Sequence, residues 1–138
     1  MIDWIRRRRA SRGSLPESQR AELEAEGLEL LEEQLEGRVT YRGYIAAGQR
    51  PATGDQATIA WLALTRRRLV VRGTQGVQLE APPGPVKFDV PQDGVLVLSY
   101  QAEDLYTSRS GAVEMRLQTP RAADIHARLQ AWTETSAS

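Results

Sequence analysis

Two runs of arginine are the first candidates for chemistry in the sequence. They comprise Arg6, Arg7, Arg8 and Arg9 near the start and Arg66, Arg67 and Arg68 in the middle. The guanidinium group is a permanently charged planar donor that suits carboxylates and phosphates. Trp4 and Ile5 precede the first run, and a basic arm with apolar bulk suits an anionic membrane surface, at about 1 kcal/mol per basic residue. Binding to an acidic segment and simple solvation are the alternatives for this arm.

The second run lies between two apolar stretches, where a tight turn is expected. Phosphate or nucleic-acid binding by such a turn is typically supported by a helix N-terminus or by interleaved aromatic residues. The neighbouring sequence supplies neither, so a solvated turn is the simpler interpretation and no nucleic-acid partner is expected. Arg66 to Arg68 remain candidates for contact with a partner.

Candidates for catalysis are sparse. His126 is the single histidine, and Glu103 and Asp104 are adjacent carboxylates. A general base needs a nucleophile and an orienting partner, and adjacent residues in a strand face opposite sides. The chain has no cysteine, which excludes disulfides and cysteine nucleophiles. We therefore expect a protein that is not an enzyme and that has no metal or cofactor.

The charge is segmented although the formal net charge of the 138 residues is zero. Residues 1–16 carry a net charge of +4, residues 17–36 carry −7, and the remainder carries +3. No apolar run reaches the roughly 18 residues that span a bilayer, and no apolar signal segment follows the first charges. Arginine outnumbers lysine, of which Lys87 is the only one, as in GC-rich bacterial genomes. One domain in a bacterial cytoplasm is expected.

The elements that must position these residues begin with a predicted helix. Residues 1–13 are predicted to be a flexible basic arm. Ser14 and Glu17 have the spacing of a capping box, and Gly37 suits a helix end. The leucines between them recur at helical spacing, so residues 14–37 are predicted to form an acidic amphipathic helix. That helix either packs on its own domain or binds a partner with its leucine stripe.

After Gly37 the apolar period changes to two, which indicates strands. The predicted strands cover residues 39–45, 57–65, 68–72, 77–80, 86–90, 95–101 (continued by 105–108) and 113–117. The connecting turns include 48–55 and Ser110-Gly111. A final helix is predicted from Thr119-Pro120, and a polar tail from residue 135. Its apolar stripe consists of Ala122, Ile125, Leu129 and Trp132.

The order of these elements resembles the pleckstrin-homology-like superfold, including bacterial PH-like and GRAM-type domains. The segment from Trp61 to Val71 is similar to the hairpin of those families, and the segment from Glu114 to Ile125 is similar to their last strand and closing helix. The resemblance covers residues 38–134. It implies a seven-stranded barrel of two near-orthogonal antiparallel sheets, capped by a C-terminal helix through Ile125, Leu129 and Trp132.

The sequence departs from the family where phosphoinositide-binding members place their basic residues. The corresponding loop, residues 48–55, has one arginine and one aspartate. Because a phosphate needs several converging donors, phosphoinositide binding is not expected there. The expected function is a non-catalytic protein-binding or scaffold module whose partner is another protein or a second copy. The alternative is peripheral association with anionic membranes through the N-terminal arm.

Overall fold

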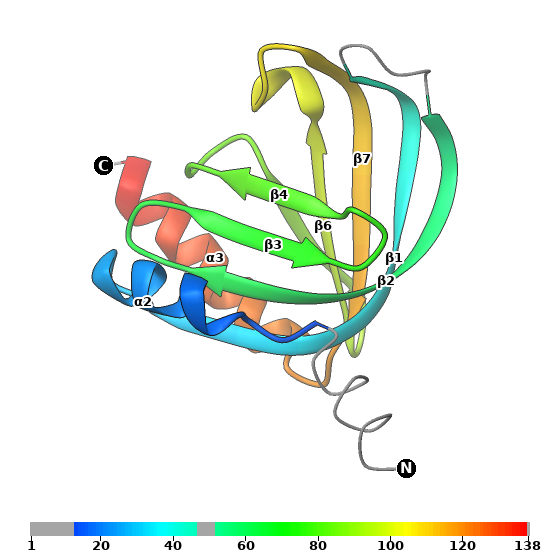
Figure 1. Cartoon of the computed structure of the whole chain (residues 1–138). Coiled ribbons are helices and arrows are strands. Elements are labelled where there is room, and N and C mark those ends of the chain that lie inside the picture. Colours follow the sequence, from blue (N-terminus) through cyan, green and yellow to red (C-terminus); the bar gives the residue numbers. More distant parts are fainter. Residues whose placement is uncertain (1–12, 47–51, 138) are drawn as a thin grey trace, which may run out of the picture.

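The computed structural model describes residues 13–46 and 52–137. Labels follow Figure 1. The helices are α2 (Glu17–Ala25), the 3-10 helix η1 (Ala102–Asp104) and α3 (Ala122–Ala137). The strands are β1 (Leu30–Ala46), β2 (Ala52–Leu64), β3 (Leu69–Gly73), β4 (Gln78–Ala81), β5 (Lys87–Gln92), β6 (Val95–Gln101) and β7 (Arg109–Gln118). Within these ranges, no helix is long and apolar enough to cross a membrane.

The strands form one antiparallel sheet in the order β4-β3-β2-β1-β7-β6-β5. The sheet curls into a half-barrel, which Figure 1 shows with α3 (red) beside it. β1 pairs with β2 and with β7, and its register shifts twice, near Gln34 and near Gly43. Such bulges bend a strand and let it serve both halves of a curled sheet. The predicted architecture, mainly strands with a C-terminal helix, is confirmed.

The inner face of the sheet and α3 share the main hydrophobic core. The predicted stripe of α3 is buried in it, with Ile125 and Leu129 fully inaccessible and Trp132 7% exposed. Val113, Met115 and Leu117 of β7 point into the same core. Ile125, Leu129 and Trp132 thus pack into the core that lines the inner face of the sheet.

A second, smaller cluster lies on the outer face of β2 and β3, beneath α2. It consists of Leu15, Leu23, Trp61, Ala63 and Val70, with Leu28 and Leu31 at its margin. Alternate residues of β2 thus face the core and the α2 cluster. This explains why residues 57–65 are apolar on both faces of the strand, as predicted for a strand covered on both sides.

The prediction of a single helix over residues 14–37 is wrong in its second half. α2 ends at Ala25, and the chain turns at Gly27, whose φ of +85° suits glycine. Leu30 then pairs with Leu64 at the start of β1. The capping box does not form, because Pro16 is the N-cap and has no side-chain cap bond. Leu15 instead donates its N–H to the Glu33 carboxylate at 2.8 Å.

Four smaller predictions also differ from the structure. Gly37 ends no helix but lies within β1, where a side chain would collide with the Arg116 carbonyl oxygen of β7. Residues 105–108 do not extend β6, since η1 and the turn after it reverse the chain there. Ser110-Gly111 is not a turn but part of β7. The polar tail from residue 135 is helical to Ala137, because α3 continues beyond its apolar stripe.

Candidate functional site

The N-terminal candidates cannot be placed. Trp4, Ile5 and the arginines from Arg6 to Arg9 lie outside the described residues. The second arginine run is described in full and forms the predicted β2–β3 turn. Thr65 organises this turn: its hydroxyl accepts the backbone N–H groups of Arg67 and Arg68, both at 3.1 Å. Arg66 and Arg67 are exposed at the tip.

Arg68 differs from its two neighbours because it is an internal clamp. It binds both carboxylate oxygens of Glu26, at 2.9 Å and 2.6 Å, and reaches Glu22 of α2 at 3.2 Å and Glu80 of β4 at 2.6 Å. Only 20% of its side chain is exposed. The hydrogen bond from Arg68 lowers the pKa of Glu26 against the opposing effect of burial. The donors of Arg68 are thus engaged within the fold, and its contact with a partner stays a prediction.

The weak catalytic candidates are not brought together. His126 lies on α3, whereas Glu103 lies in η1 and accepts the Gly111 N–H at 3.3 Å. Glu103 and Asp104 both lie in η1, between β6 and β7. Among the described residues, no group of three histidine or acidic side chains is arranged to hold a metal ion.

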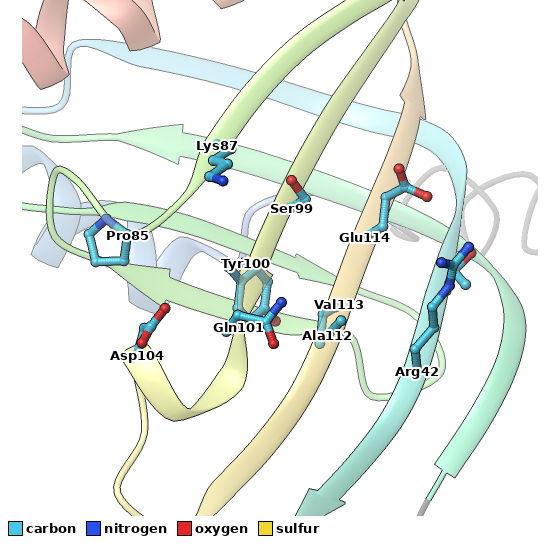
Figure 2. Close-up of a pocket in the computed structure, with 11 residues that line it drawn as sticks. Arg42, Pro85, Lys87, Ser99, Tyr100, Gln101, Asp104, Ala112, Val113 and Glu114 are labelled. Atoms are coloured by element: carbon cyan, nitrogen blue, oxygen red, sulfur yellow. The ribbon is translucent and has the colours of Figure 1, made fainter.

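A shallow hollow of about 310 Å³ lies over β1, β7, β6 and β5. Figure 2 shows Lys87, Ser99 and Glu114 side by side on three neighbouring strands, and their pairing in the sheet gives the same row. Arg42 and Asp104 also line the hollow. Basic, acidic and neutral polar groups are mixed here, as expected on the solvent-facing side of an antiparallel sheet. We assign this hollow no function.

A more distinctive arrangement is a tyrosine rim, which consists of Tyr41, Tyr44, Tyr100 and Tyr106. These are all the tyrosines of the chain. Tyr41 and Tyr100 flank Val113 from the two strands beside β7. The rings of Tyr41 and Tyr44 lie 5.3 Å apart at an angle of 54°. The rim thus gathers residues from β1, from β6 and from the turn after η1.

The rim lies at the end of the half-barrel away from α3. Tyr41 and Tyr44 are near the end of β1, whereas Glu29, just before β1, accepts a hydrogen bond from Arg128 of α3. Figure 1 shows the same separation, with η1 and the end of β1 at the top and α3 below to the left. The two ends of the half-barrel therefore offer different surfaces.

Arg109 at the start of β7 completes the rim. Its guanidinium carbon lies 4.4 Å from the centre of the Tyr106 ring, a cation–π arrangement. The Tyr106 hydroxyl accepts the Glu80 N–H at 3.2 Å, which ties the rim to β4. Ile45, beside the Ala46–Arg109 pair, is 45% exposed and is the only exposed large hydrophobic residue in the described ranges.

Burial governs the electrostatics of the rim. It raises the pKa of Tyr100 well above its ordinary value, with smaller contributions from Tyr106 and Tyr41, and it also raises the pKa of Tyr41. Both hydroxyls therefore stay protonated and can donate hydrogen bonds at neutral pH. The rim is partly apolar and partly hydrogen-bonding, and a cation lies at its edge.

Sequence reasoning missed the rim entirely. Its tyrosines span 65 positions and follow no common period, so only the pairing of β1, β7 and β6 brings them together. Comparison with known proteins adds no relative: no family model, curated protein or solved structure matches the chain.

Proposed function

We propose that this chain is a non-catalytic protein-binding or scaffold module and that the tyrosine rim is its binding surface. The observation that carries the proposal is the gathering of all four tyrosines with Arg109 and Ile45 at one end of the half-barrel. Tyrosine and arginine dominate the energetics of protein interfaces, because each combines a large contact area with a polar end. The half-buried Tyr44 and Tyr106 offer such area at little entropic cost.

A PH-like identity of the fold belongs to the same proposal. Two features support it. The strands β1 to β4 form a meander, and β7 joins this meander, through β1, to β6 and β5. In addition, α3 packs against β5 and β6. The resemblance in sequence points the same way, and the location we propose for the module is a bacterial cytoplasm. The partner is another protein or a second copy of the chain. Light scattering at high micromolar concentration separates these two partners, since a strict monomer excludes the second copy.

The test is a selection of random peptides displayed on phage against the full chain. The expected result is an enriched motif whose affinity falls about tenfold or more in Tyr44→Ala and Arg109→Ala, as hot-spot residues do. Arg116→Ala is the matched control, because Arg116 is an exposed arginine on the same strand as Arg109 but outside the rim. A motif that binds all three variants equally, or no motif at all, would contradict the proposal.

The alternative function is peripheral contact with anionic membranes through Trp4, Ile5 and the arginines from Arg6 to Arg9. It is favoured by the local net charge of +4 over residues 1–16. Flotation with vesicles of phosphatidylglycerol and phosphatidylcholine tests it on the full chain and on a chain that lacks residues 1–12. Binding that disappears with the arm supports the alternative, and negligible binding by both chains rejects it.

A further inference from the structure

A cleft of about 480 Å³ lies between the end of α3 and the β2–β3 turn, at the end of the half-barrel away from the tyrosine rim. Its floor includes Leu64, which is 1% exposed, and Trp132, which is 7% exposed. Ala131 also lines the cleft. The cleft therefore offers an apolar surface that already belongs to the packed core.

Two arginines lie at the edge of this floor. Arg66 comes from the β2–β3 turn, and Arg128 comes from α3. Arg128 donates to the backbone carbonyl of Glu29 at 2.7 Å, but within the described ranges neither arginine forms an ion pair. Arg68 shows the contrast, because three carboxylates surround it only two positions from Arg66. Arg66 and Arg128 retain donors for an external anion.

Trp132 adds an independent observation. Its indole nitrogen is buried and has no hydrogen-bond acceptor in the part of the chain that the structure describes. A buried donor without an acceptor costs about 1–3 kcal/mol, so this N–H favours any acceptor that reaches it. Arg66 and Arg128 line the same cleft as Trp132, and their side chains are exposed and long enough to adjust around a bound acceptor.

We propose that this cleft binds a small carboxylate that carries an apolar chain. The carboxylate lies between Arg66 and Arg128 and accepts the Trp132 N–H, while the apolar chain packs on Leu64. The Glu29 side chain also lines the cleft, so its three charged side chains sum to +1. That sum matches a single negative charge rather than a phosphate dianion. A free aliphatic acid and the C-terminal residue of a peptide share this chemistry.

The test follows the indole N–H signals of the full chain by nitrogen–proton NMR. Octanoate represents the aliphatic acid, and N-acetyl-leucine represents the peptide terminus. At least one of them is expected to move the Trp132 signal downfield in a saturable way, whereas octanol and N-acetyl-leucinamide leave it in place. The Trp61 signal is the internal control, since Trp61 lies beneath α2. Trp132→Phe identifies the signal by its loss.

Substitutions of single residues then test which side chains bind the carboxylate. Arg66→Gln and Arg128→Gln are each expected to weaken binding about tenfold, the effect of one lost charge-assisted hydrogen bond. Arg67→Gln, at the exposed neighbouring position, keeps wild-type affinity, and Glu29→Gln binds more tightly. The tighter of the two carboxylates identifies the source of the ligand, and either result supports the proposal.

Three results would overturn it: no shift with either carboxylate at millimolar concentration, an equal shift with octanol, or equal affinities of Arg66→Gln and Arg67→Gln. The proposal does not depend on the tyrosine rim, because the cleft shares no residue with it. Phage selection against the rim and carboxylate titration of the cleft can fail separately.

Discussion

Arg68 belongs to a run of three arginines that the sequence suggests is exposed, yet its side chain stabilises the fold through internal ion pairs. The sequence presents Arg66, Arg67 and Arg68 as equivalent, and only the docking of α2 distinguishes them. The turn formed by Thr65 directs Arg68 toward Glu26 and leaves the other two outward. A charge that bridges α2 and β4 while mostly buried contributes more than an exposed pair does.

Arg68→Ala is expected to lower the free energy of unfolding by about 2–3 kcal/mol, because charge-assisted hydrogen bonds to Glu26 and Glu80 are lost. Urea unfolding measures the effect. Arg67→Ala is the matched control in the same turn and should stay within about 0.5 kcal/mol of wild type. Equal effects of the two substitutions would contradict the clamp.

The lowered pKa of Glu26 predicts a loss of stability in acid. Its ordinary value is 4.5, and the bond from Arg68 holds the folded value below that. Between the two values the unfolded chain binds more protons, so the free energy of unfolding falls as the pH drops through this window. Thermal unfolding between pH 7 and pH 3 should show that fall, and Arg68→Ala should show a smaller one. If Arg68→Ala shows the same pH dependence as wild type, the bond between Arg68 and Glu26 is not the cause of the loss of stability in acid.

At the scale of elements, the boundary between α2 and β1 marks the limit of sequence reasoning. Residues 30–36 have leucines at helical spacing and strong helix formers, yet they form the start of a strand. Hydrogen bonds to β2 and burial of Leu30 and Leu35 in the core outweigh local helix propensity there. The bulge at Gln34 shifts the alternation, which is why the leucine spacing imitates a helix. The strands over residues 57–65, 95–101 and 113–117 and the stripe of α3 were predictable because no bulge interrupts their burial pattern.

Leu23→Ala tests the docking of α2. Leu23 is 2% exposed and packs in the cluster with Trp61 and Val70. Removing its side chain is expected to cost about 2–4 kcal/mol of unfolding free energy, measured in urea. Glu24→Ala on the exposed side of α2 should cost less than about 0.5 kcal/mol. If both variants unfold alike, α2 is not packed through Leu23.

Gly37→Ala tests the close approach of β1 and β7. An added methyl group would meet the Arg116 carbonyl oxygen, so a loss of about 3 kcal/mol in unfolding free energy is expected. Gly43→Ala is the comparison, since its surroundings are open and only its φ of +60° opposes a side chain. That variant should lose about 1 kcal/mol. A Gly37→Ala protein as stable as wild type would contradict the pairing.

At the scale of the whole molecule, the two sheet edges are protected. On β4, the Glu80 N–H is taken by the Tyr106 hydroxyl. On β5, Asp89 accepts the Val90 N–H at 2.9 Å, and Pro91 has no N–H to offer. Edges blunted in this way resist pairing with other chains. Binding through side chains of the rim therefore suits this molecule better than the addition of a strand.

α3 is expected to be indispensable for the fold. A chain that ends at Gln118 lacks the stripe that covers the inner core and should show no cooperative unfolding transition in urea. A chain that ends at Thr135 keeps Ile125, Leu129 and Trp132 and should unfold cooperatively. A cooperative transition in the shorter chain would show that the sheet is stable without its closing helix.

The double pairing of β1 has a consequence for biosynthesis. β2, β3 and β4 can pair onto β1 as each emerges from the ribosome, but Val39 of β1 also needs Met115 of β7. One edge of β1 and the inner face of the sheet therefore stay uncovered until β7 and α3 have been translated. Exposed edges and apolar faces are what nascent chains aggregate through. Translation that stalls before Gln118 would leave a product that can bury neither surface, because β7 is incomplete and α3 is missing.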